Sequence, residues 1–450
     1  MRKKDVTLSL LLVMSALFLV SFFSPCASSK NMQQGETVQE KGGQQAQLDS
    51  TQLALRKKYY SQGYEFWKNR MYSEALEPLH KVIEIDSSYT NAYFYLADSY
   101  VRLQDFDNAQ MVYESGLEVD PENKYFHRGL AYVLFAKGLE EEAIPEYEIV
   151  VADFPEESQY NRILATLYLK YGNEEGAIEQ YEQAVEVDLK ARDRLIEERK
   201  KALAEKGQED SRVKEYTTKI EALETQLQGD LPTLVSLYKR NEMDVKLPNI
   251  YLNYLKLDST DTEAMLNLGK QYYDLGENEK AIESLTHLIE LEAENVLAYQ
   301  YLGGSYLNLK KNAEAIAAYK KVIGLDPKNK KGYADLASAY NEMGQFDAAE
   351  RYVKRAIKLD SDYGYAHVVY GEIYEARATP HIDEKGRVPY KWALVFEKAV
   401  EEFEKAMKDP EWRRYAEGKK EYLKQFTPTD EQRFFHGGQE GDREPEEDNE

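Results

Sequence analysis

The sequence has a single cysteine, Cys26, in 450 residues. This excludes both an intramolecular disulfide and a metal site built from several cysteines. Glycine and proline are also scarce, at 25 and 13 residues, which excludes a collagen-like or glycine-rich chain. Hydrophobic residues make up 42% of the sequence, enough to form a packed core, so the chain as a whole is not intrinsically disordered.

Basic residues are fewer than acidic residues. The chain has 58 Lys and Arg against 81 Asp and Glu, which gives a formal net charge of −23 at pH 7. Contacts to phosphate require clustered Lys and Arg, so this balance excludes nucleic-acid binding by the surface as a whole. We expect no nucleic-acid partner, although the composition allows a local basic patch.

The sequence also lacks the patterns that mark a catalytic or cofactor site. The six histidines are scattered without metal-ligand spacing, and neither a glycine-rich phosphate loop nor a Gly-x-Ser-x-Gly elbow is present. Carboxylates are too numerous to single out a pair, which disfavours a glycan-cleaving enzyme. We therefore expect no enzyme, no cofactor and no bound metal.

Residues 1–29 have the pattern of an export signal. Three basic residues at 2–4 precede an apolar stretch from Val6 to Phe23, and small residues follow around Pro25. The apolar stretch is about long enough to span a bilayer, so an uncleaved N-terminal anchor is the alternative to a cleaved signal. In either case we expect an exported chain.

Cys26 adds a third option, because it stands just past the apolar stretch, where bacterial lipoproteins carry an acylated cysteine. The preceding Pro25 departs from that motif. The predicted location is therefore periplasmic or envelope-attached, with membrane association through the N-terminus or a lipid on Cys26. Residues 30–50 are rich in Gln and Gly without apolar periodicity, which predicts a flexible linker.

The sequence contains a strict internal repeat. Small residues recur at a step of 34, and a large residue, most often tyrosine, follows each of them three positions later. Apolar spacings of three and four predict amphipathic helices, and the small residues let two antiparallel helices approach closely. The small positions are Gly63, Ala97, Ala131 and Ala165 in a first block, and Gly269, Gly303, Ala337 and Gly371 in a second.

These residues resemble the tetratricopeptide repeat family, whose unit is a 34-residue helix–turn–helix. The resemblance implies an all-α, right-handed solenoid of about nine helical hairpins, and a scaffold that binds protein or peptide partners. Its nine copies start at Arg56, Thr90, Lys124, Ser158, Gln228, Thr262, Val296, Lys330 and Gly364. The repeat with its interruptions predicts a block of four repeats over 51–191, an insertion over 192–227, five repeats over 228–410, a capping helix over 411–426 and an acidic disordered tail over 427–450.

Two segments interrupt the repeat. The charged insertion over 192–227 has apolar residues at steps of seven, then of three and four, which predicts a coiled-coil-like helical hairpin. A plain solvated pair of charged helices is the alternative. The second interruption, Ala378 to Tyr390, separates the two helices of the ninth repeat. Phe434, Phe435 and His436, near the end of the chain, extend the cap or form a short docking motif.

In tetratricopeptide arrays the first helix of each repeat lines the inner groove. At the corresponding positions of copies one to four, basic and aromatic residues dominate although the chain is acidic overall. Such a groove suits an extended peptide with acidic side chains or a free C-terminal carboxylate, because Arg pairs with carboxylates and aromatic rings hold apolar anchors. The predicted groove residues are Lys57, Tyr60, Tyr64, Trp67, Arg102, Arg128, Tyr132, Arg162 and Lys170.

Two features qualify the prediction of a peptide-binding groove. Tyr60 and Tyr64 stand where the chaperone-type carboxylate clamp has Lys and Asn, so that ligand class is not expected. Several of the aromatic residues can instead pack between neighbouring helices. In copies six to nine the corresponding face is mixed to acidic, with Glu263, Lys270, Asp274, Lys331, Asn341, Glu342, Glu372 and Glu375.

The leading hypothesis is a non-enzymatic scaffold that recruits protein or peptide partners at the bacterial cell envelope. The resemblance extends to exported tetratricopeptide proteins of that compartment. The alternative is an accessory or regulatory subunit of an envelope enzyme complex, in cell-wall synthesis, secretion or pilus assembly.

Overall fold

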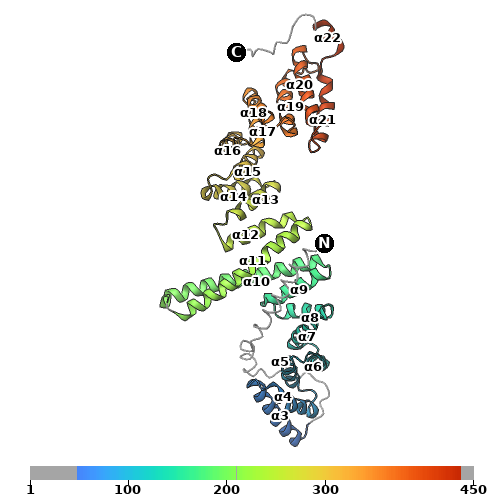
Figure 1. Cartoon of the computed structure of the whole chain (residues 1–450), viewed down its shortest axis with the longest axis vertical. Helices are drawn as coiled ribbons and strands as arrows, with labels where there is room; N and C mark the ends of the chain where they lie inside the picture. The colour runs from blue at the N-terminus through green and yellow to red at the C-terminus, as the bar shows by residue number, and fades with distance from the viewer. Residues whose placement is uncertain (1–47, 209, 437–450) are drawn as a thin grey trace. The chain divides into compact units, whose positions relative to one another are not determined.

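The computed structural model describes residues 48–208 and 210–436 (Figure 1). The predicted export signal, Cys26, most of the predicted linker and residues 437–450 of the predicted tail lie outside this part of the chain. Every regular element among the described residues is a helix. The prediction of an all-α fold of stacked helical pairs is therefore confirmed.

The helices follow one another with short connections. In the first part of the chain they are α3 (Ser50–Lys68), α4 (Tyr72–Ile85), α5 (Thr90–Arg102), α6 (Phe106–Val119), α7 (Lys124–Ala136) and α8 (Glu140–Asp153). Then come α9 (Ser158–Lys170), α10 (Glu174–Lys206), α11 (Ser211–Arg240), η1 (Asp244–Lys246), α12 (Leu247–Leu257), α13 (Thr262–Asp274), α14 (Asn278–Leu291), α15 (Val296–Asn308) and α16 (Asn312–Leu325). The last are α17 (Lys330–Glu342), α18 (Phe346–Leu359), α19 (Gly364–Ala378), η2 (Thr379–His381), α20 (Tyr390–Ala406), α21 (Arg413–Leu423), η3 (Lys424–Phe426) and α22 (Asp430–His436).

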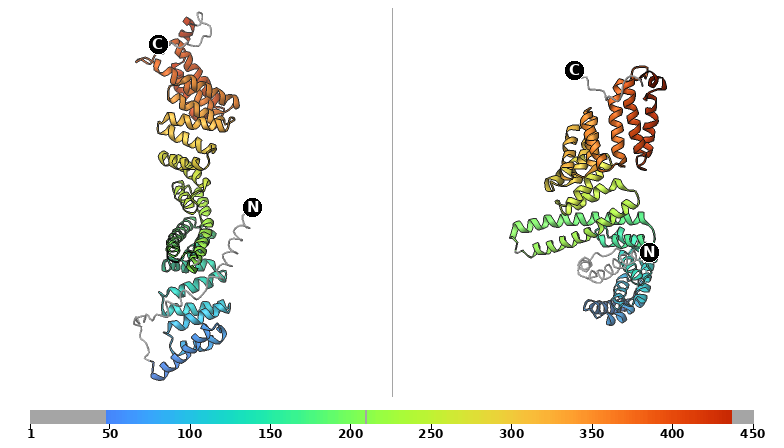
Figure 2. Two further views of the ribbon diagram at one scale, coloured as in Figure 1. Left: turned by 90° about the vertical axis from the view of Figure 1, so that its left-hand side faces the viewer. Right: turned by 45° about the horizontal axis from the view of Figure 1, so that its top comes forward.

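The chain divides into two compact units, unit 1 up to Glu146 and unit 2 from Tyr147 onward. Within unit 1, α3 packs on α4 and α5 on α6, and the first helices also contact one another, α3 with α5 and α5 with α7. Within unit 2, α13, α15, α17 and α19 form the same kind of row, each with its own second helix. Figure 2 shows these helical pairs as successive layers within each unit.

The repeat pattern has a direct steric cause. The small residue of the first helix faces a large residue on the second helix of the same pair. The large residue lies sixteen positions later at Gly63 and Gly303, and 32 positions later at Gly371, where the insertion separates the two helices. A Cβ built on Gly63 would lie 2.7 Å from Leu79, one on Gly303 would lie 2.5 Å from the Tyr319 ring, and one on Gly371 would lie 2.9 Å from Phe403. Only hydrogen fits there, so the small residues set how closely the paired helices approach.

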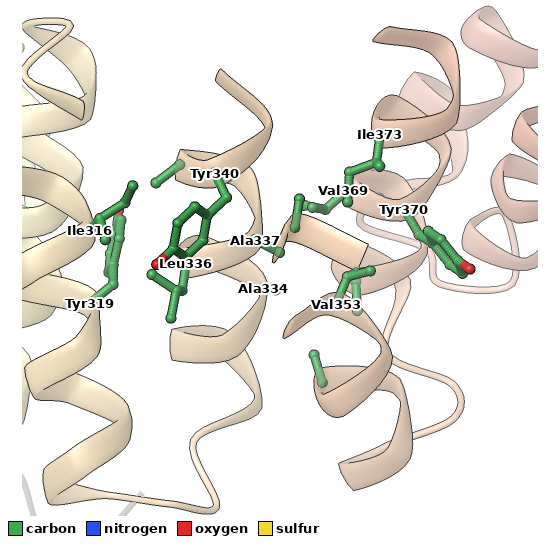
Figure 3. Close-up of a cluster of buried hydrophobic side chains, with 14 of the residues drawn as sticks. Ile316, Tyr319, Ala334, Leu336, Ala337, Tyr340, Val353, Val369, Tyr370 and Ile373 are labelled. Atoms are coloured by element: carbon green, nitrogen blue, oxygen red, sulfur yellow. The ribbon is translucent and has the colours of Figure 1, made fainter. Parts of the chain in front are cut away.

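The cores lie between consecutive pairs. Figure 3 shows one of them in unit 2, where side chains from four consecutive helices, α16 to α19, meet. Tyr319 and Tyr340 are largely buried, at 3% and 9% exposure, and Val353 and Ile373 are fully buried. The rings of Tyr319 and Tyr340 thus fill the space between successive layers.

The long insertion belongs to α10 and α11, which have 33 and 30 residues and extend beyond their neighbours (Figure 1). Ala202, Val213 and Ile220 are buried between them, and Arg192 Nε donates to Glu224 Oε1 at 2.6 Å. Asp188 lies inside α10. The helix continues through this position because its packing partner α11 runs alongside.

The C-terminal end of unit 2 has additional helices over its last repeat. The segment between α19 and α20 is held by stacking of His381 on Trp392, with ring centroids 3.7 Å apart. Ala416 and Leu423 of α21 are fully buried against this region. The segment predicted as a disordered tail, 427–450, instead begins with a short connection and the helix α22, and Arg433 Nη2 of α22 lies 2.5 Å from Glu397 Oε1 of α20.

A buried histidine joins α19 to α20. His367 Nδ1 lies 2.6 Å from Glu402 Oε2 and its Nε2 lies 2.9 Å from the Ser361 carbonyl oxygen, so both ring nitrogens face acceptors. Burial alone would lower the pKa of His367, but the hydrogen bonds to Glu402 and Ser361 outweigh it and raise that pKa above its ordinary value. The neighbouring Lys405, which pairs with Glu402 at 2.6 Å, acts in the lowering direction.

Replacing Gly303 by Ala is expected to destabilise the protein by about 1–3 kcal/mol, because the new methyl group overlaps the Tyr319 ring. The control is Gly324→Ala in the following helix, where no atom lies within 4 Å of the added Cβ. That change should stabilise by about 0.5–1 kcal/mol through helix propensity alone. Denaturant unfolding compares the two, and equal effects of the same sign would contradict the steric account.

The His367–Glu402 pair predicts a pH-dependent stability. A folded-state pKa raised above the unfolded one adds stability that is complete below the unfolded value of about 6.5 and is lost as pH rises through the folded value. His367→Gln should therefore lower the denaturant midpoint more at pH 6 than at pH 8.5. A constant difference between parent and variant over that range would show that folding does not raise the pKa of His367.

Candidate functional site

The first helices of unit 1 bring most of the predicted groove residues onto one face. Tyr60, Tyr64 and Trp67 follow one another on α3 at helical spacings of four and three, which places them on the same side. Because α3 contacts α5 and α5 contacts α7, the residues that these helices contribute form a continuous row. We call this surface the N-terminal face; it consists of Lys57, Tyr60, Tyr64, Trp67, Asp98, Arg102, Arg128 and Tyr132.

Aromatic rings pack together at one end of the N-terminal face. Tyr95 of α5 is the hub: its ring centroid lies 5.1 Å from that of Tyr64 and 4.7 Å from that of Trp67. Tyr60 lies 5.0 Å from Tyr89 in an edge-on arrangement. Burial raises the pKa of Tyr95 to about 12 and raises that of Tyr60 as well, so these phenols are neutral at physiological pH. The predicted aromatics thus pack between helices, yet Tyr60, Tyr64 and Trp67 each keep part of their surface exposed.

Charged side chains lie next to these rings. Trp67 Nε1 donates to Asp98 Oδ2 at 2.6 Å, and Arg102 Nε lies 3.5 Å from the same oxygen. The Asp98 side chain is only 13% exposed, so the one acid of this face is largely withdrawn from solvent. The guanidinium carbon of Arg128 lies 5.2 Å from the centre of the Tyr125 ring. A ligand at this face therefore meets aromatic and cationic groups before it meets the carboxylate.

Tyr113 of α6, a second helix, reaches the N-terminal face from the side of the second helices. The Tyr113 ring fills the space beside Gly129 of α7, where a Cβ would lie 2.2 Å from it. Burial raises the pKa of Tyr113; Asp98 raises it further, whereas Arg128 and Arg102 lower it. The charges of Arg102, Arg128 and Asp98 thus all act on Tyr113. The sequence analysis did not assign it to the site, and Gly129, a small residue outside the regular small positions, is the signal that could have found it.

Arg162 and Lys170, the remaining predicted groove residues, belong to α9 in unit 2. Arg162 Nε donates to Asp230 Oδ2 at 2.8 Å, and its Nη2 also pairs with Asp188. The side chains of Asp188 and Asp230 are 3% and 9% exposed. Burial raises the pKa of Asp230, and Arg162 opposes that shift. We therefore assign Arg162 to the internal packing of unit 2, where it joins three helices, rather than to a peptide-binding face; Lys170 is exposed, two turns further along α9.

Unit 2 has a second polar centre around Asp335 of α17. The residue is 4% exposed, and its carboxylate accepts from Lys331 Nζ at 2.8 Å and from Gln300 Nε2 at 3.5 Å. Burial raises the pKa of Asp335, while Lys331 and the Tyr365 hydroxyl lower it. The sequence analysis predicted Lys331 on this face and missed Asp335, which lies one turn further along the same helix.

The predicted acidic residues of the last repeat are partly covered by α21. Tyr415 donates its hydroxyl proton to Glu372 Oε1 at 2.5 Å, and Lys419 Nζ pairs with Glu375 Oε2 at 2.8 Å. Burial raises the pKa of Glu372. These contacts attach α21 to the first helix of the last repeat, so part of the mixed-to-acidic face contacts the chain itself.

Among the described residues, no group of three or more His, Cys, Asp and Glu side chains is arranged to hold a metal ion. A search of the same residues for a helix that is both long and apolar enough to cross a membrane finds none.

Replacing Arg162 by Met is expected to cost about 3–5 kcal/mol of unfolding free energy, because two carboxylates would remain buried without their cation. The control is Arg240→Met, which removes an exposed pair with Glu174 and should change stability by less than about 0.5 kcal/mol. Denaturant unfolding followed by circular dichroism measures both. Equal, small losses would show that the Arg162 pairs do not hold α9, α10 and α11 together.

Models of a known protein family match parts of the chain. Two family models described as tetratricopeptide repeat match it, one over residues 306–374 and the other over residues 94–149, 141–193 and 266–330. No curated protein matches the sequence.

Several solved structures match part of the chain at low TM-scores. A crystal structure of MamA matches with 25% identity, 40% of this chain and 95% of that chain covered, and a TM-score of 0.33. A tetratricopeptide repeat protein from Parabacteroides merdae matches with 13% identity, 71% and 99% coverage, and a TM-score of 0.27. The TPR2AB domain of yeast Sti1, in complex with pHSP90, matches with 19% identity, 72% and 99% coverage, and a TM-score of 0.25.

The family assignment rests on the matched models together with the helix pairs and the small-to-large contacts described above. Stacked pairs of this kind expose a row of first helices as an extended binding surface, and the fold is typically a non-enzymatic protein-interaction scaffold. The chain belongs to the tetratricopeptide repeat family.

Proposed function

We propose that this chain is a non-enzymatic scaffold of the bacterial cell envelope that binds a peptide segment of a partner protein on the N-terminal face. The observation that carries the proposal is the combination of partly exposed aromatic rings with Arg102, Arg128 and Lys57 on one row of helices. Such a face favours a segment with an apolar or aromatic anchor beside acidic side chains or a terminal carboxylate.

The charges of the N-terminal face support this choice of ligand. The face has three cationic side chains and one acid, and that acid is already contacted by Trp67 and Arg102. The chain as a whole has a net charge of −23, so an acidic segment is repelled by most of the surface and attracted here. Charge attraction therefore helps to orient an acidic segment at the N-terminal face as well as to bind it there.

The proposed envelope location rests on the sequence of residues 1–29, with its basic start and apolar stretch. Export with retention through an anchor or through Cys26 would place the repeats beside envelope proteins. In this setting the partner is either a protein that the chain recruits or an enzyme whose activity it regulates.

Reversing the charge of Arg128 should strongly weaken partner binding while leaving the fold intact. A lost charge-assisted hydrogen bond costs about 1.5–3 kcal/mol, which corresponds to roughly tenfold to hundredfold in affinity. The experiment captures partners from native bacterial envelopes with residues 30–450 carrying Arg128→Glu. Lys58→Glu is the matched control, because it makes the same change on α3 next to Tyr59, outside the N-terminal face.

Parent and variants are first compared by helicity and melting, so that unfolding is not mistaken for loss of binding. Partners retained by the parent and by Lys58→Glu but lost by Arg128→Glu support the N-terminal face. Partners retained equally by all three would contradict it. Recovery of one enzyme in equal amount with the scaffold would favour the regulatory-subunit form of the proposal.

A further inference from the structure

The most exposed large apolar side chain among the described residues is Phe434 of α22, at 82%, and its neighbour Phe435 is 65% exposed. The helix is attached through polar contacts: Arg433 pairs with Glu397, and Gln432 Nε2 donates to the Val388 carbonyl oxygen at 3.2 Å. Two adjacent phenylalanines that are attached through polar contacts and exposed to solvent form an apolar surface available to another molecule.

The sequence that follows these phenylalanines is strongly acidic. Residues 437–450 contain seven acids and one base, Arg443, which gives a net charge of 1 − 7 = −6. An aromatic pair followed by an acidic stretch has the chemistry of the segment that the N-terminal face favours. The apolar part needs aromatic partners, and the acidic part needs Lys and Arg.

The N-terminal face offers both kinds of partner, aromatic rings and basic side chains. Tyr60, Tyr64 and Trp67 are half-buried rings with exposed surface, and Arg102 and Arg128 lie further along the row of first helices. The rest of the chain is acidic and repels a segment of charge −6, which makes this basic face the favoured place for it.

We infer that the N-terminal face of one copy binds the segment 434–450 of a second copy of this chain. The inference rests on the proposed function of the same face and names a ligand for it. Because the two contacting surfaces differ, the contact is heterologous: each copy has one face and one segment, and copies join head to tail into a ring or an open series. Charge attraction makes the contact weaken as salt rises.

The first test measures binding of a fluorescent peptide with the sequence of residues 430–450 to the full-length chain carrying Phe434→Ala and Phe435→Ala. This receptor lacks the aromatic pair that would compete for the face. We expect saturable binding that weakens at least tenfold when Arg128→Glu is added and is unchanged by Lys58→Glu. A peptide of the same composition in scrambled order should bind more weakly.

The second test follows the mass of the full-length chain by sedimentation velocity over a range of concentrations. We expect the mass to increase with concentration at low salt, and the increase to disappear with Phe434→Ala and Phe435→Ala. Val245→Ala, which removes an apolar side chain exposed at 72% elsewhere in unit 2, should leave it unchanged. A chain that stays monomeric throughout, or a peptide that binds regardless of Arg128, overturns the inference.

Failure of this self-recognition can be distinguished from failure of the proposed function. If envelope partners still depend on Arg128 while the chain's own peptide does not bind, only the self-recognition fails. If neither the envelope partners nor the peptide depend on Arg128, the N-terminal face is not a binding surface and both proposals fail.

Discussion

The contact between a small residue on the first helix and a large residue on the second helix governs this structure. At Gly63, Gly303 and Gly371 even a methyl group would collide with the facing side chain, so glycine lets the paired helices approach closely there. Helical pairs recur along both units, and within each unit first helices contact one another. The row of first helices, and with it any extended binding face, is a consequence of this packing.

The same rule determines where polar groups meet. The Tyr113 ring lies beside Gly129, close to Asp98, Arg102 and Arg128, and the Tyr319 ring lies beside Gly303, where burial and the charge of Asp335 raise the pKa of Tyr319. In both units a glycine admits a tyrosine from the second helix to the side where the first helices present their charges. Packing and electrostatics are therefore coupled, and the glycines of the first helices belong to the architecture of the candidate site.

Sequence reasoning recovers the features that are local. The 34-residue step predicts the helical pairs, and spacings of three and four predict which residues of α3 share a face. It fails for contacts between distant segments: Arg162 has the residue type and repeat position of a groove residue, but its partner Asp230 is 68 positions away on the inserted hairpin. Asp335 is likewise placed by its neighbours Gln300 and Tyr365 in other repeats, which no single-repeat pattern reveals.

The central claim is that the N-terminal face, and not the outer surface of the repeats, contacts the partner. The most direct measurement places a photo-crosslinking phenylalanine analogue at Tyr64 on that face and, separately, at Met111, which is 56% exposed on the second helix α6. Irradiation in intact bacterial envelopes should give a crosslinked species from position 64 and none from position 111. Equal crosslinking at both positions, or crosslinking at Met111 alone, would contradict the account.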